Sequence, residues 1–255
     1  MHDPFFWQVR RHFARPPAPS AGWALFLDLD GTLLDIAPEP DAVIVPPDLL
    51  KNLDRARRVL GGALAIVSGR PLHDLDRLLA PLHLPASGGH GATVRTPDGK
   101  VHGCELGLPA PWINLLRDFA ANDANLLLEE KPNSAALHYR AAMWREQSCQ
   151  EFCHALIDGL EEQFQVLQGR MVVEIKPRAV NKARAVDILM RTSPFAGRTP
   201  VFVGDDETDL DGMKAAVSLG GLGLDVLDWF AGSPGEVRKW VAAIGRLGKP
   251  GQAAA

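Results

Sequence analysis

The 255-residue sequence is poor in cysteine and has no cysteine pair at metal-binding spacing. Its three cysteines, Cys104, Cys149 and Cys153, are odd in number and form no C-x-x-C motif. This pattern argues against a disulfide framework and against a structural zinc site. A reducing cytoplasm is therefore the expected compartment.

Basic blocks and long apolar runs are also absent. The chain has 27 Lys and Arg against 31 Asp and Glu, scattered along its length, so the electrostatic footprint of a nucleic-acid-binding protein is missing. No apolar run approaches the ~20 residues of a membrane span, and the N-terminus lacks the apolar core of a signal peptide. Neither nucleic acid nor a membrane is expected as a partner. The sequence does not fix the oligomeric state, and a monomer is compatible with it.

The most informative stretch is Leu25–Leu33, where an apolar run ends in Asp28 and Asp30 and is followed by a Gly-Thr pair. Such a run predicts a buried parallel strand, and functional groups collect at the carboxyl ends of these strands. Residues two apart on a strand point the same way, so the two carboxyl groups would lie roughly 6–7 Å apart. The Asp-Gly pair is also common in type I′ hairpin turns. Because no alternating second strand follows, a site is favoured over a turn.

Elsewhere the first third of the chain alternates strands and helices. A helix is predicted from Pro46 to Leu60 and a second buried strand over Ala63–Val67. That strand is followed by a Ser-Gly-Arg sequence and by a helix that Pro71 opens. This alternation predicts an α/β fold with a doubly wound parallel sheet.

The middle of the chain has a different pattern. Residues 104–178 contain in order a helix, two extended segments, a helix near 143–163 and two more extended segments. The pattern predicts an inserted α+β domain, so that residues 1–103 and 179–255 form the catalytic core, with residues 1–20 as an N-terminal arm.

The α/β pattern returns in the last third of the chain. A helix is predicted over 182–191 and a strand over Pro200–Val203, with a further short strand near 216–219. Ser233 followed by proline and, at the third position, glutamate predicts the start of the last helix. Residues 248–255 are expected to form a disordered tail.

The strand at Pro200–Val203 is followed by four acids within six residues: Asp205, Asp206, Glu207 and Asp209. Taken alone, they could be an acid-rich helix start that the helix dipole stabilises. Together with Asp28 and Asp30, they would crowd carboxylates at the ends of two neighbouring strands, which requires a cation. An all-oxygen donor set without His or Cys suits Mg²⁺.

Candidate phosphate-binding groups face these acids in the predicted sheet. Ser68 offers a hydroxyl and, with Gly69, backbone N–H groups at a helix start, whereas Lys182 lies in the first turn of a helix that Asn181 would cap. Each residue alone would be read as an ordinary helix cap or an exposed lysine. Their order along the chain, between the two acidic motifs, makes the combination specific.

These motifs resemble those of the haloacid dehalogenase superfamily of phosphotransferases, and the insert resembles its type C2B cap. Over about residues 24–240, the sequence is most similar to the trehalose-6-phosphate phosphatase family. The specific phrases are Leu-Ala-Ile-Val-Ser-Gly-Arg at 64–70, Gly-His-Gly-Ala at 89–92, Ala-Leu-His-Tyr-Arg at 136–140, Val-Glu-Ile-Lys-Pro at 173–177, Asn-Lys at 181–182 and Gly-Asp-Asp-x-Thr-Asp at 204–209.

The resemblance implies a Mg²⁺-dependent phosphatase of trehalose biosynthesis that works through an aspartyl-phosphate. Asp28 would be the nucleophile, and Asp30 the general acid and then the base. Asp28, Asp205 and the backbone carbonyl of Asp30 would hold the metal, with Asp206 and Asp209 as supporting acids. Three residues would bind the phosphoryl group: Ser68, Gly69 and Lys182.

The resemblance also implies that the cap closes over the site and binds the sugar. Five cap residues are candidates for sugar contacts: Lys131, His138, Arg140, Glu174 and Lys176. Glu174 and Lys176 lie two apart on a predicted strand, so they point to the same side. A solvated cap surface is the alternative interpretation of these side chains.

Two other functions remain open from the sequence. A C2B phosphatase acting on sucrose phosphate, mannosyl phosphoglycerate or a hexose phosphate would share the core motifs. A receiver-like phospho-acceptor module would share the acidic pocket, the hydroxyl and the lysine, but it needs neither Asp30 nor a cap of this size.

Overall fold

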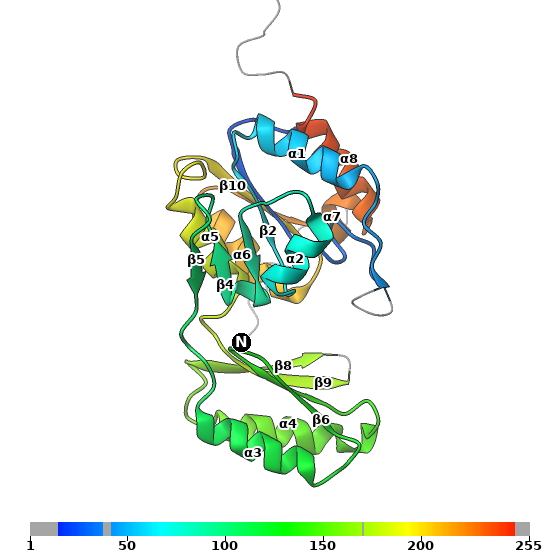
Figure 1. Ribbon diagram of the computed structural model, residues 1–255, viewed down its shortest axis with the longest axis vertical. Helices are drawn as coiled ribbons and strands as arrows, with labels where there is room; N and C mark the ends of the chain where they lie inside the picture. Colours follow the sequence, from blue (N-terminus) through cyan, green and yellow to red (C-terminus); the bar gives the residue numbers. More distant parts are fainter. Residues whose placement is uncertain (1–14, 38–41, 170, 248–255) are drawn as a thin grey trace, which may run out of the picture. The chain divides into compact units, whose positions relative to one another are not determined.

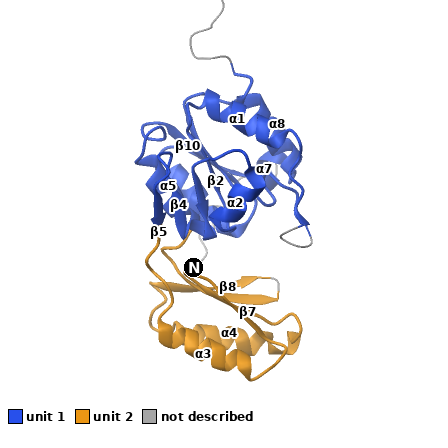
Figure 2. Cartoon of the chain, viewed as in Figure 1, with its two compact units in different colours: residues 1–102, 182–255 blue, residues 103–181 orange. Residues whose placement is uncertain are grey.

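The structure is a computed structural model that describes residues 15–37, 42–169 and 171–247 (Figure 1). Most of the predicted arm and the predicted tail, residues 1–14 and 248–255, lie outside the described residues. The chain divides into two compact units, residues 1–102 with 182–255 and residues 103–181 (Figure 2). The predicted insert, residues 104–178, falls within the second unit.

The described part of the first unit is built on a seven-stranded sheet. Its first five strands are parallel, and β4 runs antiparallel to β3. In sheet order the strands are β11 (Leu222–Asp225), β10 (Thr199–Gly204), β1 (Trp23–Leu27), β2 (Leu64–Val67), β3 (Ala86–Gly88), β4 (Thr93–Arg95) and β5 (Val101–Gly103). The aspartate-bearing strand β1 is therefore central, between β10 and β2.

Helices cover both faces of this sheet (Figure 1). One face carries α1 (Leu49–Val59), α2 (Leu72–Leu79), α7 (Val226–Phe230) and α8 (Pro234–Ile244). The other carries α5 (Lys182–Met190) and α6 (Leu210–Ser218). Strand β1 is fully buried, because Leu25 and Leu27 pack into the first layer and Phe26 packs against Phe195 and Phe202 in the second. The predicted doubly wound α/β fold is confirmed.

Of two elements predicted near the C-terminus, the structure contains the helix but not the strand at its expected position. The short strand expected near 216–219 is wrong, because α6 continues to Ser218 and the strand forms later, as β11. Gly220 with φ +79° turns the chain between them, and a side chain at Gly221 would collide with the carbonyl of Pro200. The last helix begins as expected, and the Ser233 hydroxyl accepts the Glu236 N–H at 3.4 Å.

The second unit contains a four-stranded antiparallel sheet among its described residues. In sheet order the strands are β6 (Leu127–Glu130), β7 (Ala135–His138), β9 (Val172–Pro177) and β8 (Phe164–Gly169). Helices α3 (Ala110–Ala121) and α4 (Glu146–Leu156) cover one face of it (Figure 1). The helix expected near 143–163 is thus shorter, with a 3₁₀ turn at Met143–Arg145 before α4.

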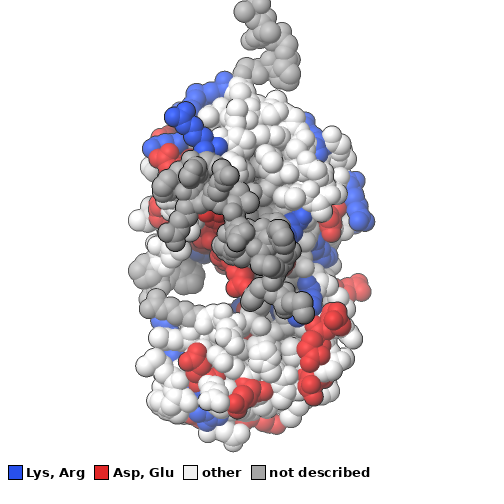
Figure 3. Space-filling model, turned by 180° about the vertical axis from the view of Figure 1, so that it is seen from behind, with Lys and Arg blue, Asp and Glu red and all other residues white. Residues whose placement is uncertain are grey.

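Strand alternation in the second unit separates a core face from an open face. Leu137, Val173 and Ile175 point toward the helices and are fully buried. Their neighbours Glu174 and Lys176 consequently point to the face without helices. No helix in the described part of the chain is long and apolar enough to span a membrane. Acidic and basic side chains lie among large uncharged areas on the described surface that Figure 3 shows.

Candidate active site

The candidate site lies where the central strands end. Leu27 is paired with Val203 on one side and with Ile66 on the other. The Asp28 N–H then donates to the Val203 carbonyl at 3.0 Å, which fixes the backbone at the first aspartate. The loops after β1, β2 and β10 therefore start side by side at the carboxyl edge of the sheet, as expected for a site in an open α/β fold.

The Gly-Thr pair after Asp30 has a clear structural reason. Gly31 adopts φ +81°, and a Cβ atom there would collide with the Asp205 carboxylate. The next hydroxyl, of the fully buried Thr32, donates to Asp205 Oδ1 at 3.0 Å. The turn after β1 thus brings the acid after β10 into the site, and no hairpin forms.

A lysine lies between two buried carboxylates at the centre of the site. Lys182 Nζ, in the first turn of α5, donates to Asp28 Oδ1 at 2.8 Å and to Asp209 Oδ1 at 2.5 Å. The exposed fractions of these side chains are 2%, 6% and 0%, in that order. The sequence predicted Lys182 as a phosphate ligand, and the structure also makes it the counter-ion of Asp28.

The acid-rich segment after β10 is held by its own backbone. Asp209 Oδ2 accepts the N–H groups of Asp205 and Asp206, each at 3.2 Å, and Asp206 Oδ1 accepts the Asp209 N–H at 3.1 Å. This reciprocal capping box starts the 3₁₀ turn Glu207–Asp209. The acids after β10 therefore do start a helical turn, as the alternative interpretation expected. The same acids also lie near Asp28, so they belong to the candidate site as well.

Burial dominates the electrostatics of the site. It raises the pKa of Asp28 to about 6, against the opposing charge of Lys182. It raises the pKa of Asp209 to about 8, and the Asp28 charge adds to this shift. Burial also raises the pKa of Asp205. The pKa of Lys182 lies above its usual range, because the nearby carboxylates outweigh the effect of burial. In the absence of a second cation, the site therefore favours the protonated form of Asp28, Asp205 and Asp209.

Three of these carboxylates fit a divalent cation. One oxygen each from Asp28, Asp205 and Asp209 lies within 4.8 Å of the others. Oxygen-only donors, with burial that penalises their uncompensated charge, match the preference of Mg²⁺. The structure thus gathers the carboxylates of Asp28, Asp205 and Asp209. The backbone carbonyl of Asp30, which the resemblance adds to the metal ligands, stays a prediction.

Asp30 has a bidentate ion pair with Arg70. Arg70 Nε donates to Asp30 Oδ2 at 2.6 Å, and Nη2 donates to Oδ1 at 2.7 Å. From the sequence alone, the arginine of the Ser-Gly-Arg motif has no predicted role. A cation directly after the strand beside β1 was the available signal.

Ser68 lies in a buried turn at the end of β2. Its side chain is almost inaccessible, its N–H donates to the Ser87 carbonyl at 2.9 Å, and its Oγ accepts the Arg70 N–H at 3.1 Å. The predicted phosphate residues Ser68, Gly69 and Lys182 therefore lie at the ends of β2 and α5, on the same sheet edge as Asp28.

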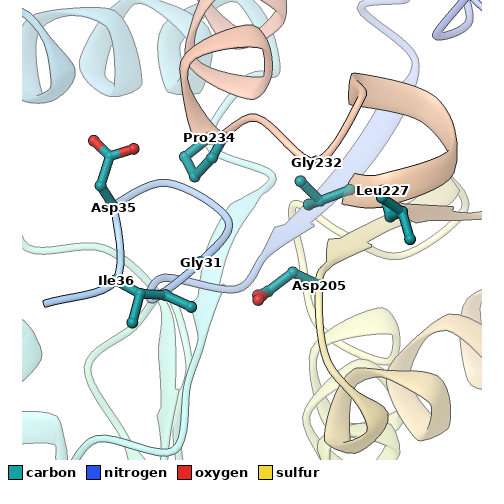
Figure 4. A pocket seen from close by; sticks show the side chains of 8 residues that line it. Gly31, Asp35, Ile36, Asp205, Leu227, Gly232 and Pro234 are labelled. Atoms are coloured by element: carbon teal, nitrogen blue, oxygen red, sulfur yellow. The ribbon is translucent and has the colours of Figure 1, made fainter. Parts of the chain in front are cut away.

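A cavity of about 360 Å³ opens beside the acids. It is lined by Gly31, Asp35, Ile36, Asp205, Val226, Leu227, Gly232 and Pro234. The carboxylate of Asp205 points into it, next to Gly31 (Figure 4). One side of the predicted metal ligand thus faces open space.

In the second unit, two of the predicted sugar residues, Glu174 and Lys176, lie on the face of the sheet that carries no helices. Lys131 Nζ lies 3.5 Å from Glu174 Oε1, which also accepts the Ser134 hydroxyl at 2.5 Å. Lys176, two residues after Glu174 on β9, is only 5% exposed. Ser134 is not among the residues predicted from the sequence, although its position just before β7 places it near Lys131 and Glu174.

The other two predicted sugar residues are arranged differently. His138 Nε2 lies 2.9 Å from Glu129 Oε2, and Glu129 is also within 3.8 Å of Lys131. Arg140 lies in the exposed turn after β7. Glu129 thus joins His138 to Lys131, and Lys131 in turn contacts Glu174. Glu129 is not among the residues predicted from the sequence, despite its two-residue spacing from Lys131.

Comparisons with known proteins agree with this geometry. The family model described as trehalose-phosphatase matches residues 26–227. A probable trehalose-phosphate phosphatase of Sinorhizobium fredii is 41% identical over 207 residues, which cover 80% of this chain and 77% of that protein. The trehalose-6-phosphate phosphatase of Escherichia coli is 38% identical over 237 residues, covering 89% and 88%.

Solved structures share the fold at low sequence identity. The C-terminal domain of C. albicans trehalose-6-phosphate phosphatase has a TM-score of 0.66 at 20% identity, covering 88% of this chain and 92% of that one. A haloalkanoate-superfamily phosphatase from Bacteroides thetaiotaomicron has a TM-score of 0.54 at 15% identity, covering 75% and 80%. The chain therefore belongs to the trehalose-phosphatase family of phosphoric monoester hydrolases, with the haloacid dehalogenase fold.

Proposed function

We propose that this chain hydrolyses trehalose 6-phosphate to trehalose and phosphate, with Mg²⁺, through an aspartyl-phosphate on Asp28. The observation that carries the proposal is the buried arrangement of Asp28, Lys182 and Asp209 beside Asp205. It combines a carboxylate nucleophile, a fixed cation and a set of oxygen donors. The names of the relatives supply the sugar phosphate.

The metal is assigned by its donor chemistry. In this proposal Asp28, Asp205 and the backbone carbonyl of Asp30 would hold Mg²⁺, and Asp206 and Asp209 would support them. When bound, the ion offsets the negative charge of the acids and of the phosphoryl group. Every other step is carried out by the chain's own residues.

Asp28 attacks phosphorus and forms the aspartyl-phosphate, while the bond from phosphorus to the sugar oxygen breaks. Asp30 gives its proton to that departing oxygen. Asp30 then takes a proton from the water that attacks phosphorus, so that phosphate leaves and Asp28 is regenerated. In this structure both oxygens of Asp30 accept from Arg70, so Asp30 has to leave this ion pair before it can carry a proton to the sugar oxygen.

Binding is divided between two groups of residues. Ser68, Gly69 and Lys182 bind the phosphoryl oxygens in this proposal, where donors and positive charge stabilise the transferring group. The hydroxyls of the sugar are bound by the polar residues of the second unit: Lys131, His138, Arg140, Glu174 and Lys176. Carboxylates and ammonium groups on an accessible face suit a disaccharide, because hydroxyls both donate and accept. A cytoplasmic location and the absence of nucleic-acid partners remain predictions from the sequence.

The test is phosphate release from a panel of substrates. Trehalose 6-phosphate, sucrose 6-phosphate, mannosyl phosphoglycerate and glucose 6-phosphate are compared with Mg²⁺ and with EDTA. We expect the largest kcat/KM for trehalose 6-phosphate and no turnover after full chelation. Preference for another sugar phosphate would retain the chemistry and reject the substrate. Stable labelling of Asp28 without steady turnover would support a phospho-acceptor module instead.

A further inference from the structure

His90 has a backbone conformation that L-amino acids rarely adopt. It lies in the 3₁₀ turn Gly89–Gly91 with φ +53° and ψ +38°, between two glycines that also have positive φ. A side chain in this left-handed region is disfavoured by local sterics, and such residues gather at functional sites where the surrounding structure holds them. The sequence motif that contains His90 has no role in the site described above.

The imidazole ring of His90 lies directly against Gly69. A Cβ atom built on Gly69 would overlap the ring, and its three nearest atoms all belong to His90. Gly69 itself does not have positive φ, so its lack of a side chain is required by the ring and not by its own backbone. The middle residue of the Ser68–Arg70 turn is thus covered by an aromatic side chain.

Backbone hydrogen bonds fasten the same two segments together. His90 N–H donates to the Ser68 carbonyl and Gly89 N–H to the Arg70 carbonyl, both at 3.0 Å. A Cβ on Gly88 would come within 2.7 Å of the Arg70 carbonyl oxygen. The turn that carries the predicted phosphate ligands therefore rests on Gly88–His90.

The loop of His90 is also tied to the helix of the catalytic lysine. Arg184, two residues after Lys182 on α5, donates from Nη1 to the Gly91 carbonyl at 2.6 Å. The ring of His90 thus lies in a loop that contacts both the Ser68 turn and the helix of Lys182. A displacement of this loop would disturb the two groups that are assigned to the phosphoryl oxygens.

We propose that His90 is a positioning residue for phosphate binding, whose ring holds the Ser68–Arg70 turn in place by packing on Gly69. The inference rests on the proposed assignment of this turn to the phosphoryl group. This role explains the left-handed backbone of His90, because that conformation directs the ring onto Gly69. The ring faces Gly69 with its Nε2 edge, because the atoms nearest to a Cβ at Gly69 are Nε2, Cε1 and Cδ2.

The decisive measurement is the affinity of the chain for inorganic phosphate, by calorimetric titration with Mg²⁺ present. We expect His90→Gly and Gly69→Ala each to weaken binding about tenfold, because small misplacements of binding groups have large effects. In the double variant, Gly69→Ala should add almost nothing, because the ring that its methyl group meets is absent. His90→Phe keeps a planar ring and should bind phosphate more tightly than His90→Gly, although the left-handed backbone suits phenylalanine less well than histidine.

The controls separate this role from others. His83→Gly changes an exposed histidine and should leave phosphate binding unchanged. Thermal unfolding of each variant identifies any loss of fold. The proposal would be overturned if the losses of phosphate affinity were additive in the double variant. It would also be overturned if His90→Phe bound phosphate as weakly as His90→Gly. Because titration needs no turnover, a wild type that binds phosphate without hydrolysing trehalose 6-phosphate would refute the proposed function alone.

Discussion

The two polar clusters of this protein differ in burial. In the first unit, Lys182 and its partners Asp28 and Asp209 are all at most 6% exposed. In the second unit, the side chains of Lys131 and Glu129 are 38% and 49% exposed. Charges in a dry interior interact strongly and cannot be screened, whereas exposed ion pairs contribute little to stability.

This difference indicates how the two clusters divide the work. The buried cluster has charges of fixed position, which is what stabilisation of a transferring phosphoryl group requires. The exposed cluster holds groups that can exchange water for sugar hydroxyls. Substitutions in the first cluster should therefore lower turnover of every substrate. Substitutions in the second cluster should lower turnover only of a substrate that carries a sugar.

The largest expected effect is that of Asp28→Asn. An amide is a far poorer nucleophile than a carboxylate, so phosphate release from trehalose 6-phosphate and from an aryl phosphate should both fall below detection. Asp54→Asn, on α1 and paired with Arg57 and Arg58 at the surface, should keep normal activity. Activity of Asp28→Asn within a hundredfold of the wild type would remove Asp28 as the nucleophile.

Most of the buried cluster was predictable because it depends on sheet topology. Asp28, Ser68 and Asp205 each follow a predicted apolar strand, and the alternation of strands and helices orders those strands in a parallel sheet. Once β1 lies between β10 and β2, these residues meet at one edge. Lys182 could be placed from its position at the start of a helix in the same pattern.

The features that could not be predicted from the sequence depend on the conformation of individual loops. The fork between Arg70 and Asp30 requires the exact course of the turn after β2, which in turn rests on the Gly88–His90 segment. No periodicity in the sequence reports such contacts. The misplaced strand near 216–219 has a similar cause, since apolar residues at the end of α6 look the same as a short buried strand.

A smaller and more selective effect is expected for Asp30→Asn. The variant cannot donate or accept a proton at this position, which should lower turnover of trehalose 6-phosphate by about 10²–10⁴. An aryl phosphate has a good leaving group, so a rapid-quench experiment should still detect the aspartyl-phosphate, with its hydrolysis slowed. Absence of phosphoenzyme in a folded Asp30→Asn variant would contradict the assigned role.

The predicted sugar contacts of the second unit are tested by Glu174→Ala and Lys176→Ala, at two residues that are less exposed than Lys131 and Glu129. Each lost charged hydrogen bond to a sugar hydroxyl should remove roughly 1.5–3 kcal/mol, or about one to two orders of magnitude in kcat/KM. Turnover of an aryl phosphate should stay within a few-fold, because the phosphate site is untouched. The control is Glu130→Gln, on β6 of the same sheet, where the native carboxylate pairs with Arg117. Equal losses on both substrates would assign these residues to folding instead.

The smallest expected effect is on stability, and it reports the burial of the first cluster directly. The pKa of Asp28 is raised to about 6 and that of Asp209 to about 8, mainly by burial. Between about pH 4 and pH 8, the folded metal-free chain therefore binds more protons than the unfolded chain. Stability from these two groups must fall as pH rises through this window.

Mg²⁺ should reverse this loss, because it binds the ionised carboxylates and only in the folded state. Thermal unfolding at pH 5 and pH 8, with EDTA and with Mg²⁺, should show that the ion stabilises the chain more at pH 8. Asp28→Asn should remove on the order of 1–3 kcal/mol of the metal-free pH dependence. Asp76→Asn is the matched control: Arg95 holds the pKa of Asp76 below its usual value, so its stabilisation is complete above about pH 4 and constant across the window. A pH dependence that Asp28→Asn leaves unchanged would show that the charge of Asp28 is as well solvated as the charges of the exposed cluster.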